Sequence, residues 1–214
     1  MASKLIQKTL QLQREFSKLV ITKNHLPKKI MSICGVDVSY SEKKAFCSAV
    51  IIEKNTMDIV ESVRVSETII APYIPGLFML RESRVILKAL KKLKSKFDVL
   101  LIDGNGRLHP RLCGLASFIG IKIDKPTIGV AKKLLCGKIL QDNMIEYDDQ
   151  VLGYVMEHQK KKIYVSIGHK INLKRGSQIV EDLILEEKWY PEPLRLADLD
   201  SKLFRKGKTQ KFLN

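Results

Sequence analysis

The sequence lacks long apolar runs and contains few cysteines. No run of 18 uncharged apolar residues occurs, which excludes a transmembrane helix. The first ten residues lack the apolar core of a secretory signal. The four cysteines, Cys34, Cys47, Cys113 and Cys136, are widely spaced and form no CxxC pair. We therefore expect free thiols in a reducing cytoplasm, and neither a zinc knuckle nor a redox motif.

Acidic residues are scarce relative to basic ones. In the 214 residues, 38 Lys and Arg stand against 23 Asp and Glu, which leaves a net charge of +15. This excess indicates a polyanionic partner, with nucleic acid favoured over a membrane surface. The hydrophobic fraction of 45% allows one sizeable core and excludes disorder over most of the length. We expect one domain over residues 1–204 and a basic, mobile tail over 205–214.

The hydrophobic periodicity predicts an α/β chain. Helical spacing indicates helices at 4–20, 77–97, 112–120 and 178–187, with a short one opening at 131–135. Runs rich in Val and Ile predict strands at 31–40, 46–53, 59–67, 99–102, 127–130, 147–157 and 163–167. Three closely spaced strands followed by alternating helices and strands are typical of a mixed sheet with helices on its faces.

Three acidic residues stand where a charge is unexpected. Asp37 lies within a strand rich in valine, Glu82 falls in the apolar stripe of helix 77–97, and Asp103 ends a short apolar strand. Each also has an ordinary interpretation. Asp37 would face solvent, Glu82 would lean outward from a first helical turn, and Asp103 would form a turn before glycine.

Taken together, the three carboxylates support a more specific hypothesis. They come from the first strand, the long helix and the next strand, so they can converge at one end of the sheet. Such a cluster repels itself unless cations bind, and Mg²⁺ prefers oxygen ligands. Two such ions can stabilise the attacking and leaving oxygens of phosphodiester hydrolysis. A basic protein with an acidic, metal-binding centre therefore indicates a nuclease.

Six motifs, in this order, closely resemble the endonuclease V family. They are GVDVSY at 35–40, PYIPG at 72–76, RE at 81–82, DGNG at 103–106, HPR at 109–111 and GVAK at 129–132. The segment PEPLRLAD at 191–198 also resembles the family's C-terminal part. The resemblance implies a ribonuclease H-like fold, a five-stranded mixed sheet flanked by helices on both faces. It also implies an endonuclease acting at deaminated bases, chiefly hypoxanthine, in DNA repair or inosine-RNA processing.

The same resemblance implies the reaction and its catalytic residues. The family hydrolyses the second phosphodiester bond 3′ to the lesion and leaves 3′-hydroxyl and 5′-phosphate ends. By position, Asp37, Glu82 and Asp103 are the expected ligands of Mg²⁺, with Mn²⁺ as a substitute. His109 is expected beside them, near the scissile phosphate, and Lys132 near the cleaved phosphate, where its charge would stabilise the transition state.

Substrate recognition is expected from a wedge loop and a base pocket. By resemblance, Pro72, Tyr73, Ile74 and Pro75 form a wedge that fills the gap left by a flipped base. The alternative is a rigid connector whose tyrosine packs on the core. Gly76 and Gly104 would allow close backbone approach to the base. Leu115 and Leu135 are expected to line the pocket, in which backbone N–H groups would bind O6 of hypoxanthine and reject the amino group of adenine.

Two other functions remain open at this point. One is a different ribonuclease H-like nuclease, such as a junction resolvase, which would not need a base-sensing loop. The other is a non-catalytic module that binds nucleic acid through its basic surface. We expect a monomeric cytoplasmic protein without a membrane partner, whose substrate is DNA or RNA containing deaminated bases.

Overall fold

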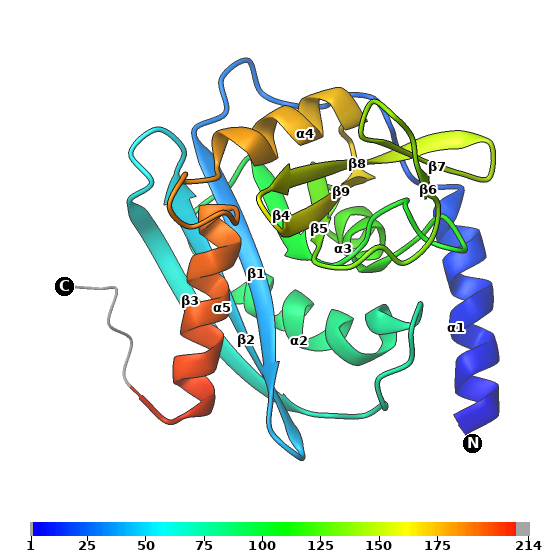
Figure 1. The fold of residues 1–214 in the computed structure, drawn as a ribbon. Coiled ribbons are helices and arrows are strands. Elements are labelled where there is room, and N and C mark those ends of the chain that lie inside the picture. The colour runs from blue at the N-terminus through cyan, green and yellow to red at the C-terminus, as the bar shows by residue number, and fades with distance from the viewer. Residues whose placement is uncertain (1, 209–214) are drawn as a thin grey trace.

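A single mixed sheet forms the centre of the molecule (Figure 1). The structure, a computed structural model, describes residues 2–208. In spatial order the sheet's nine strands are β3 (Ile59–Thr68), β2 (Lys44–Glu53), β1 (Ser32–Tyr40), β4 (Val99–Asp103), β5 (Thr127–Ala131), β9 (Lys161–His169), β8 (Gln150–His158), β7 (Met144–Tyr147) and β6 (Lys138–Ile139). Strands β1, β4 and β5 are parallel, and every other pairing is antiparallel.

The five-stranded sheet implied by the family resemblance is too small, because the sheet continues past β5. The first five strands in spatial order are β3, β2 and β1, which correspond to the three closely spaced predicted strands and pair antiparallel, followed by β4 and β5, which pair parallel. Strand β9 then pairs with the open edge of β5, and β8, β7 and β6 extend the sheet from there. The predicted strand 147–157 is interrupted because Asp148 and Asp149 both adopt positive φ, at 56° and 55°, which turns the chain back between β7 and β8.

Helices cover both faces of the sheet, as predicted. Helices α1 (Ala2–Ser17), α2 (Phe78–Lys92) and α3 (Leu115–Ile123) contribute to the apolar core on one face. Helices α4 (Leu173–Asp182) and α5 (Glu192–Arg205) contribute to the core on the other face. Figure 1 shows α5 lying across β1, β2 and β3, with α2 behind them. No helix within residues 2–208 is long and apolar enough to cross a membrane.

Several helical boundaries differ from the prediction. Helix α4 covers Leu173–Asp182, earlier than the predicted 178–187, because the Asn172 side chain caps its N-terminus. The segment 131–135 forms no helix. Helix α5 was not predicted, because Pro191 and Pro193 disguise its start, although proline is tolerated in a first helical turn. Residues 209–214 of the expected tail lie outside the described residues, so the division at 204 stays a prediction.

Helix α5 lies unusually close to β1 at one point. A Cβ atom on Gly35 would stand 2.4 Å from the backbone carbonyl of Pro193, so only glycine fits there. This close approach lets the N-terminal part of α5 lie directly on β1. The face of β1 beneath α5 carries Asp37, so the helix covers a predicted site residue.

Candidate active site

Asp37 and Asp103 are neighbours just beyond the paired part of two parallel strands, where Asp103 ends β4 and β1 continues for three residues past Asp37. The register pairs Val36 of β1 with Ile102 of β4, so the next residue of each strand is one of the two aspartates. Asp37 is only 8% exposed, which excludes the solvent-facing interpretation. Burial raises the pKa of Asp37 to about 6, with further contributions from the charges of Asp103 and Asp198. The side chain is therefore a buried carboxyl in a negative environment.

Glu82 points inward from α2, as its angular position predicted. It is 4% exposed, and its Oε1 accepts a hydrogen bond from the Tyr40 hydroxyl at the end of β1. The guanidinium of Arg81 lies 4.2 Å from the centre of the Tyr40 ring. Burial raises the pKa of Glu82 well above its usual value, and the charges of Asp37 and Asp103 raise it further. All three predicted metal ligands therefore interact electrostatically with one another.

Lys132 supplies a positive charge next to this cluster. Its Nζ lies 2.6 Å from Asp103 Oδ2 and 4.7 Å from the centre of the Tyr190 ring. Burial alone would lower the pKa of Lys132, but the charges of Asp103, Asp37 and Asp198 raise it overall. The ammonium group is thus held in its charged form beside the carboxylates. Tyr190 was not identified from the sequence, because nothing in its local pattern indicates that it reaches this centre.

The chemistry of these donors fits a hard divalent cation, although they do not form a closed ligand set. Within residues 2–208, no three His, Cys, Asp or Glu side chains are grouped closely enough to hold a metal ion. Each carboxylate is bonded to its own partner instead: Asp37 to Ser201, Glu82 to Tyr40 and Asp103 to Lys132. The donors are all oxygen atoms with excess negative charge, as Mg²⁺ prefers. A cation would have to compete with Lys132 for Asp103.

Asp198 is a fourth carboxylate near the centre that the sequence analysis did not identify. It lies on α5, and its charge raises the pKa values of both Asp37 and Lys132. Its Oδ2 accepts a hydrogen bond from Lys202 Nζ at 2.7 Å, one helical turn further on. The only sequence signal for Asp198 was that it ends the segment 191–198, which resembles the family's C-terminal part. Its approach to Asp37 depends on how α5 packs against β1, which no local pattern predicts.

A cavity of about 370 Å³ adjoins Asp103 and Lys132. Six of the eight residues predicted for substrate binding line it: Tyr73, Ile74, Gly76, Gly104, Leu115 and Leu135. Pro72 and Pro75 do not line this cavity, and neither do Asp37 and Glu82. The wedge tyrosine is 63% exposed, with its ring edge-on to Phe78 at 5.6 Å, so it is not packed in the core. The structure therefore brings the predicted wedge and pocket residues together around one hollow.

His109 also lines the cavity, but its ring nitrogens are both engaged elsewhere. Its Nε2 lies 2.9 Å from the Gly76 carbonyl oxygen, and its Nδ1 accepts from the Arg111 backbone N–H at 3.1 Å. Burial and the charge of Arg111 lower the pKa of His109 to about 4, so the neutral ring donates from Nε2. The Gly76 carbonyl also accepts from Gln13 and Arg111. In this arrangement His109 holds the end of the wedge loop, and its expected place beside the phosphate stays a prediction.

These features together define a class of protein. Carboxylates on two neighbouring parallel strands and on a helix packed against the sheet, a lysine beside them, an adjoining cavity and a strongly basic chain define an α/β enzyme that hydrolyses nucleic acid. The sequence model of the Endonuclease V family matches residues 14–199. The chain belongs to the Endonuclease V family, as its motifs predicted, and it is an endonuclease.

Similar proteins agree with this assignment. An endonuclease V from Thermofilum pendens is 38% identical over 208 residues, which cover 94% of this chain and 90% of the relative. The crystal structure of endonuclease V from Bacillus subtilis is 32% identical, with a TM-score of 0.85 and coverage of 94% of this chain and 92% of the other. The structure of endonuclease V from Ciona intestinalis is 26% identical, with a TM-score of 0.85 and coverage of 95% and 99%. The Ciona protein is in complex with a 24-mer DNA containing an inosine followed by a ribo-adenosine.

These matches confirm the predicted α/β architecture with helices on both faces of a mixed sheet. Membership of an endonuclease family also decides between the functions left open by the sequence. It favours a catalytic protein over a non-catalytic basic module, and it favours endonuclease V over a junction resolvase.

Proposed function

We propose that this chain cuts nucleic acid beside deaminated bases, chiefly hypoxanthine, with Mg²⁺ as its cofactor. The cut falls at the second phosphodiester bond 3′ to the lesion and leaves 3′-hydroxyl and 5′-phosphate ends. The observation that carries the proposal is that Asp103 belongs both to the carboxylate cluster and to the wall of the adjoining cavity. The cavity volume of about 370 Å³ lies within the range of about 300–1,000 Å³ that is usual for small-ligand sites. The inosine-containing DNA bound by the Ciona relative supports this substrate class.

In this proposal the carboxylates hold the cation and Lys132 acts on the phosphate. Asp37, Glu82 and Asp103 would bind Mg²⁺, or Mn²⁺ in its place. When bound, such an ion activates the attacking water and stabilises the charge on the departing oxygen. With Asp103 serving as a ligand of the ion, the ammonium of Lys132 would be free to contact the scissile phosphate. Its fixed positive charge would then offset the negative charge that develops there.

The cavity would hold the flipped base and select it by hydrogen bonding. Leu115 and Leu135 provide apolar walls, and Gly76 and Gly104 line the cavity beside them. Hypoxanthine carries an oxygen at the position where adenine carries an amino group. A backbone N–H would donate to that oxygen, whereas an amino group would leave the N–H unpaired and be rejected. The neighbouring Tyr73 would fill the space left in the base stack.

The proposal is tested with end-labelled strands that contain one inosine, prepared as DNA and as RNA. We expect cleavage at a single position, one nucleotide beyond the bond adjacent to inosine on its 3′ side, when Mg²⁺ is present. Strands with adenosine in place of inosine should stay intact, and EDTA should stop the reaction until excess Mg²⁺ is added. Cleavage that ignores the base, or that persists in EDTA, would contradict the proposal.

The wedge is tested by Tyr73→Ala. We expect the variant to lose about tenfold or more in affinity for inosine-containing strands, because aromatic stacking on bases contributes about 1–3 kcal/mol. Tyr73→Phe keeps the ring and should retain most of that affinity. Affinity is measured by fluorescence anisotropy with EDTA present, so that no strand is cut. Equal losses of affinity for inosine-containing and unmodified strands would show that the ring does not sense the lesion.

A further inference from the structure

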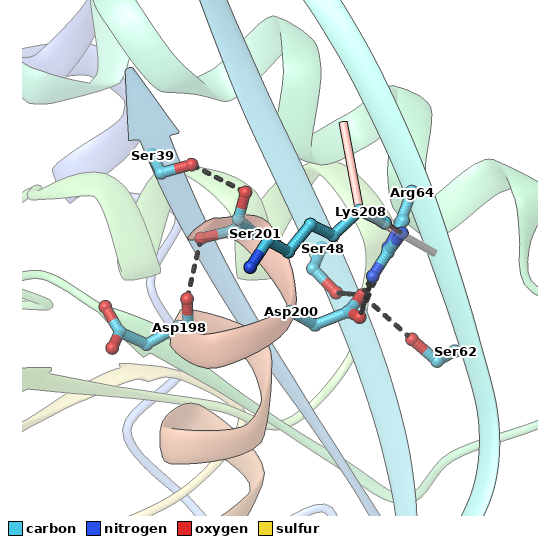
Figure 2. A network of polar contacts seen from close by, with 8 residues as sticks. All are labelled: Ser39, Ser48, Ser62, Arg64, Asp198, Asp200, Ser201 and Lys208. Carbon is cyan, nitrogen blue, oxygen red and sulfur yellow. Dashed lines mark hydrogen bonds and ion pairs between the residues drawn. The ribbon is translucent and has the colours of Figure 1, made fainter. Parts of the chain in front are cut away.

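Helix α5 is held on the sheet by a buried ion pair. Asp200 is fully buried, and its carboxylate accepts two-pronged donation from Arg64, with Nη2 at 2.6 Å from Oδ1 and Nε at 3.1 Å from Oδ2. Ser48 and Ser62 also donate to Asp200 (Figure 2). The strand register aligns Asp37 of β1 with Ser48 of β2, and Ser48 with Arg64 of β3. The ion pair therefore anchors α5 directly above the row of residues that contains Asp37.

The next residue of α5, Ser201, contacts Asp37 itself. Ser201 is fully buried, and its Oγ lies 2.9 Å from Asp37 Oδ2 and 3.0 Å from the Asp198 carbonyl oxygen. A hydroxyl has one proton to donate, and an ionised acceptor forms the stronger bond. The proton is therefore directed to Asp37 whenever that carboxylate is charged. The Ser201 backbone carbonyl accepts from Ser39 Oγ at 2.8 Å, which holds this turn of α5 against β1 (Figure 2).

We propose that Ser201 is a positioning residue that orients the Asp37 carboxylate for cation binding. The Ser201 hydroxyl donates a hydrogen bond to Asp37 Oδ2. The other carboxylate oxygen, Oδ1, accepts no hydrogen bond from a side chain or backbone group within residues 2–208. A carboxylate fixed in this way presents one oxygen to the centre that it shares with Asp103 and Glu82. Partners that orient metal ligands commonly change metal affinity or activity by about 10–100-fold when they are removed. This inference rests on the proposed cation site.

The test is Ser201→Ala, examined in the full-length chain by isothermal titration calorimetry with Mn²⁺ alone. We expect the variant to bind Mn²⁺ about tenfold more weakly than the unaltered chain, because the freed carboxylate must be ordered when the ion binds. The Mg²⁺ concentration that half-saturates cleavage should rise in parallel. Alanine is smaller than serine, so the substitution creates no steric conflict within the buried turn.

Ser39→Ala is the matched control. It also removes one buried hydrogen bond between β1 and the same turn of α5, but it leaves the bond from Ser201 to Asp37 in place. Both variants should melt at a lower temperature than the unaltered chain. Only Ser201→Ala should weaken Mn²⁺ binding, whereas the dissociation constant of Ser39→Ala should be unchanged within the error of the measurement.

The outcomes separate this inference from the proposed function. Mn²⁺ affinity that is unchanged in Ser201→Ala, or equally weakened in both variants, would overturn the positioning role, because the hydroxyl would then only dock α5. An unaltered chain that binds no Mn²⁺ would also overturn it. If the chain binds Mn²⁺ and Ser201→Ala weakens that binding, the inference stands even where inosine strands are not cut, and only the proposed substrate fails.

Discussion

Replacing Asp37 with Asn is expected to abolish cleavage of inosine-containing strands while the protein still binds them. Asn has the same shape, and its side-chain oxygen can accept the hydrogen bond from Ser201, but it lacks the charge that holds a cation. Loss of a metal-dependent step removes several kcal/mol of transition-state stabilisation, which corresponds to a rate loss of about a thousandfold or more. Binding should persist or tighten, because one negative charge near the phosphate is removed. Single-turnover cleavage and fluorescence anisotropy measure the two effects.

The fold should tolerate this substitution. The raised pKa of Asp37, about 6, means that folding disfavours its ionised form at neutral pH, so a neutral side chain imposes no electrostatic penalty. Asp58→Asn is the control, because it makes the same charge change on an exposed residue in the β2–β3 turn, at the opposite end of the sheet. It should cleave at the normal rate. Persistent cleavage by the Asp37 variant, or loss of binding with the fold intact, would refute the assigned role.

Arg64→Met is expected to destabilise the protein by about 3–5 kcal/mol, because it leaves the buried charge of Asp200 without its guanidinium partner. The Asp200 side chain is fully buried, and the Arg64 side chain is only 14% exposed. The loss is measured as the change in the free energy of unfolding by urea titration. Helix α5 carries both Asp198 and Ser201, so weaker anchoring should also raise the Mg²⁺ requirement of cleavage.

A double substitution separates the cost of the unpaired charge from the cost of lost packing. Arg64→Met combined with Asp200→Leu removes both charges and should regain a large part of the stability, as replacement of buried ion pairs commonly does. Lys162→Met is the surface control, since the Lys162–Glu157 pair is 46% and 39% exposed and solvent screens it, so it should contribute little to stability. A loss from Arg64→Met no larger than that from Lys162→Met would mean that the ion pair does not anchor α5.

Part of the candidate site could be predicted from local sequence. Asp103 follows a short apolar run, and such strands end at the edge of a parallel sheet where ligands bind. Glu82 falls in the apolar stripe of α2, and its burial agrees with that pattern. The burial of Asp37 was harder to predict, because side chains of a strand alternate between two faces and the strand's sequence does not tell which face is covered. The helix that covers this face is α5, whose start is hard to predict because two prolines lie there.

The residues around the carboxylates could not be predicted, because their contacts span most of the chain. Ser201 lies 164 residues from Asp37, and Gln13 reaches the cavity next to the wedge loop from α1. His109 was expected near the metal ligands, yet both its ring nitrogens bond to backbone atoms. The predicted strands 147–157 and 163–167 correspond largely to β8 and β9, but their place beyond β5 could not be predicted, because pairing at an open strand edge depends on which segments lie there in the folded chain.

The sequence by itself determined the polyanionic partner, the α/β class and the identity of the three acidic side chains. These follow from composition, from periodicity over a few residues and from motifs whose parts lie close together in the chain. The tertiary structure alone decided which face of β1 is buried, how α5 brings Asp198 and Ser201 to Asp37, and where the cavity lies. Those outcomes depend on packing between distant segments, such as Pro193 against Gly35, and no local pattern contains that information.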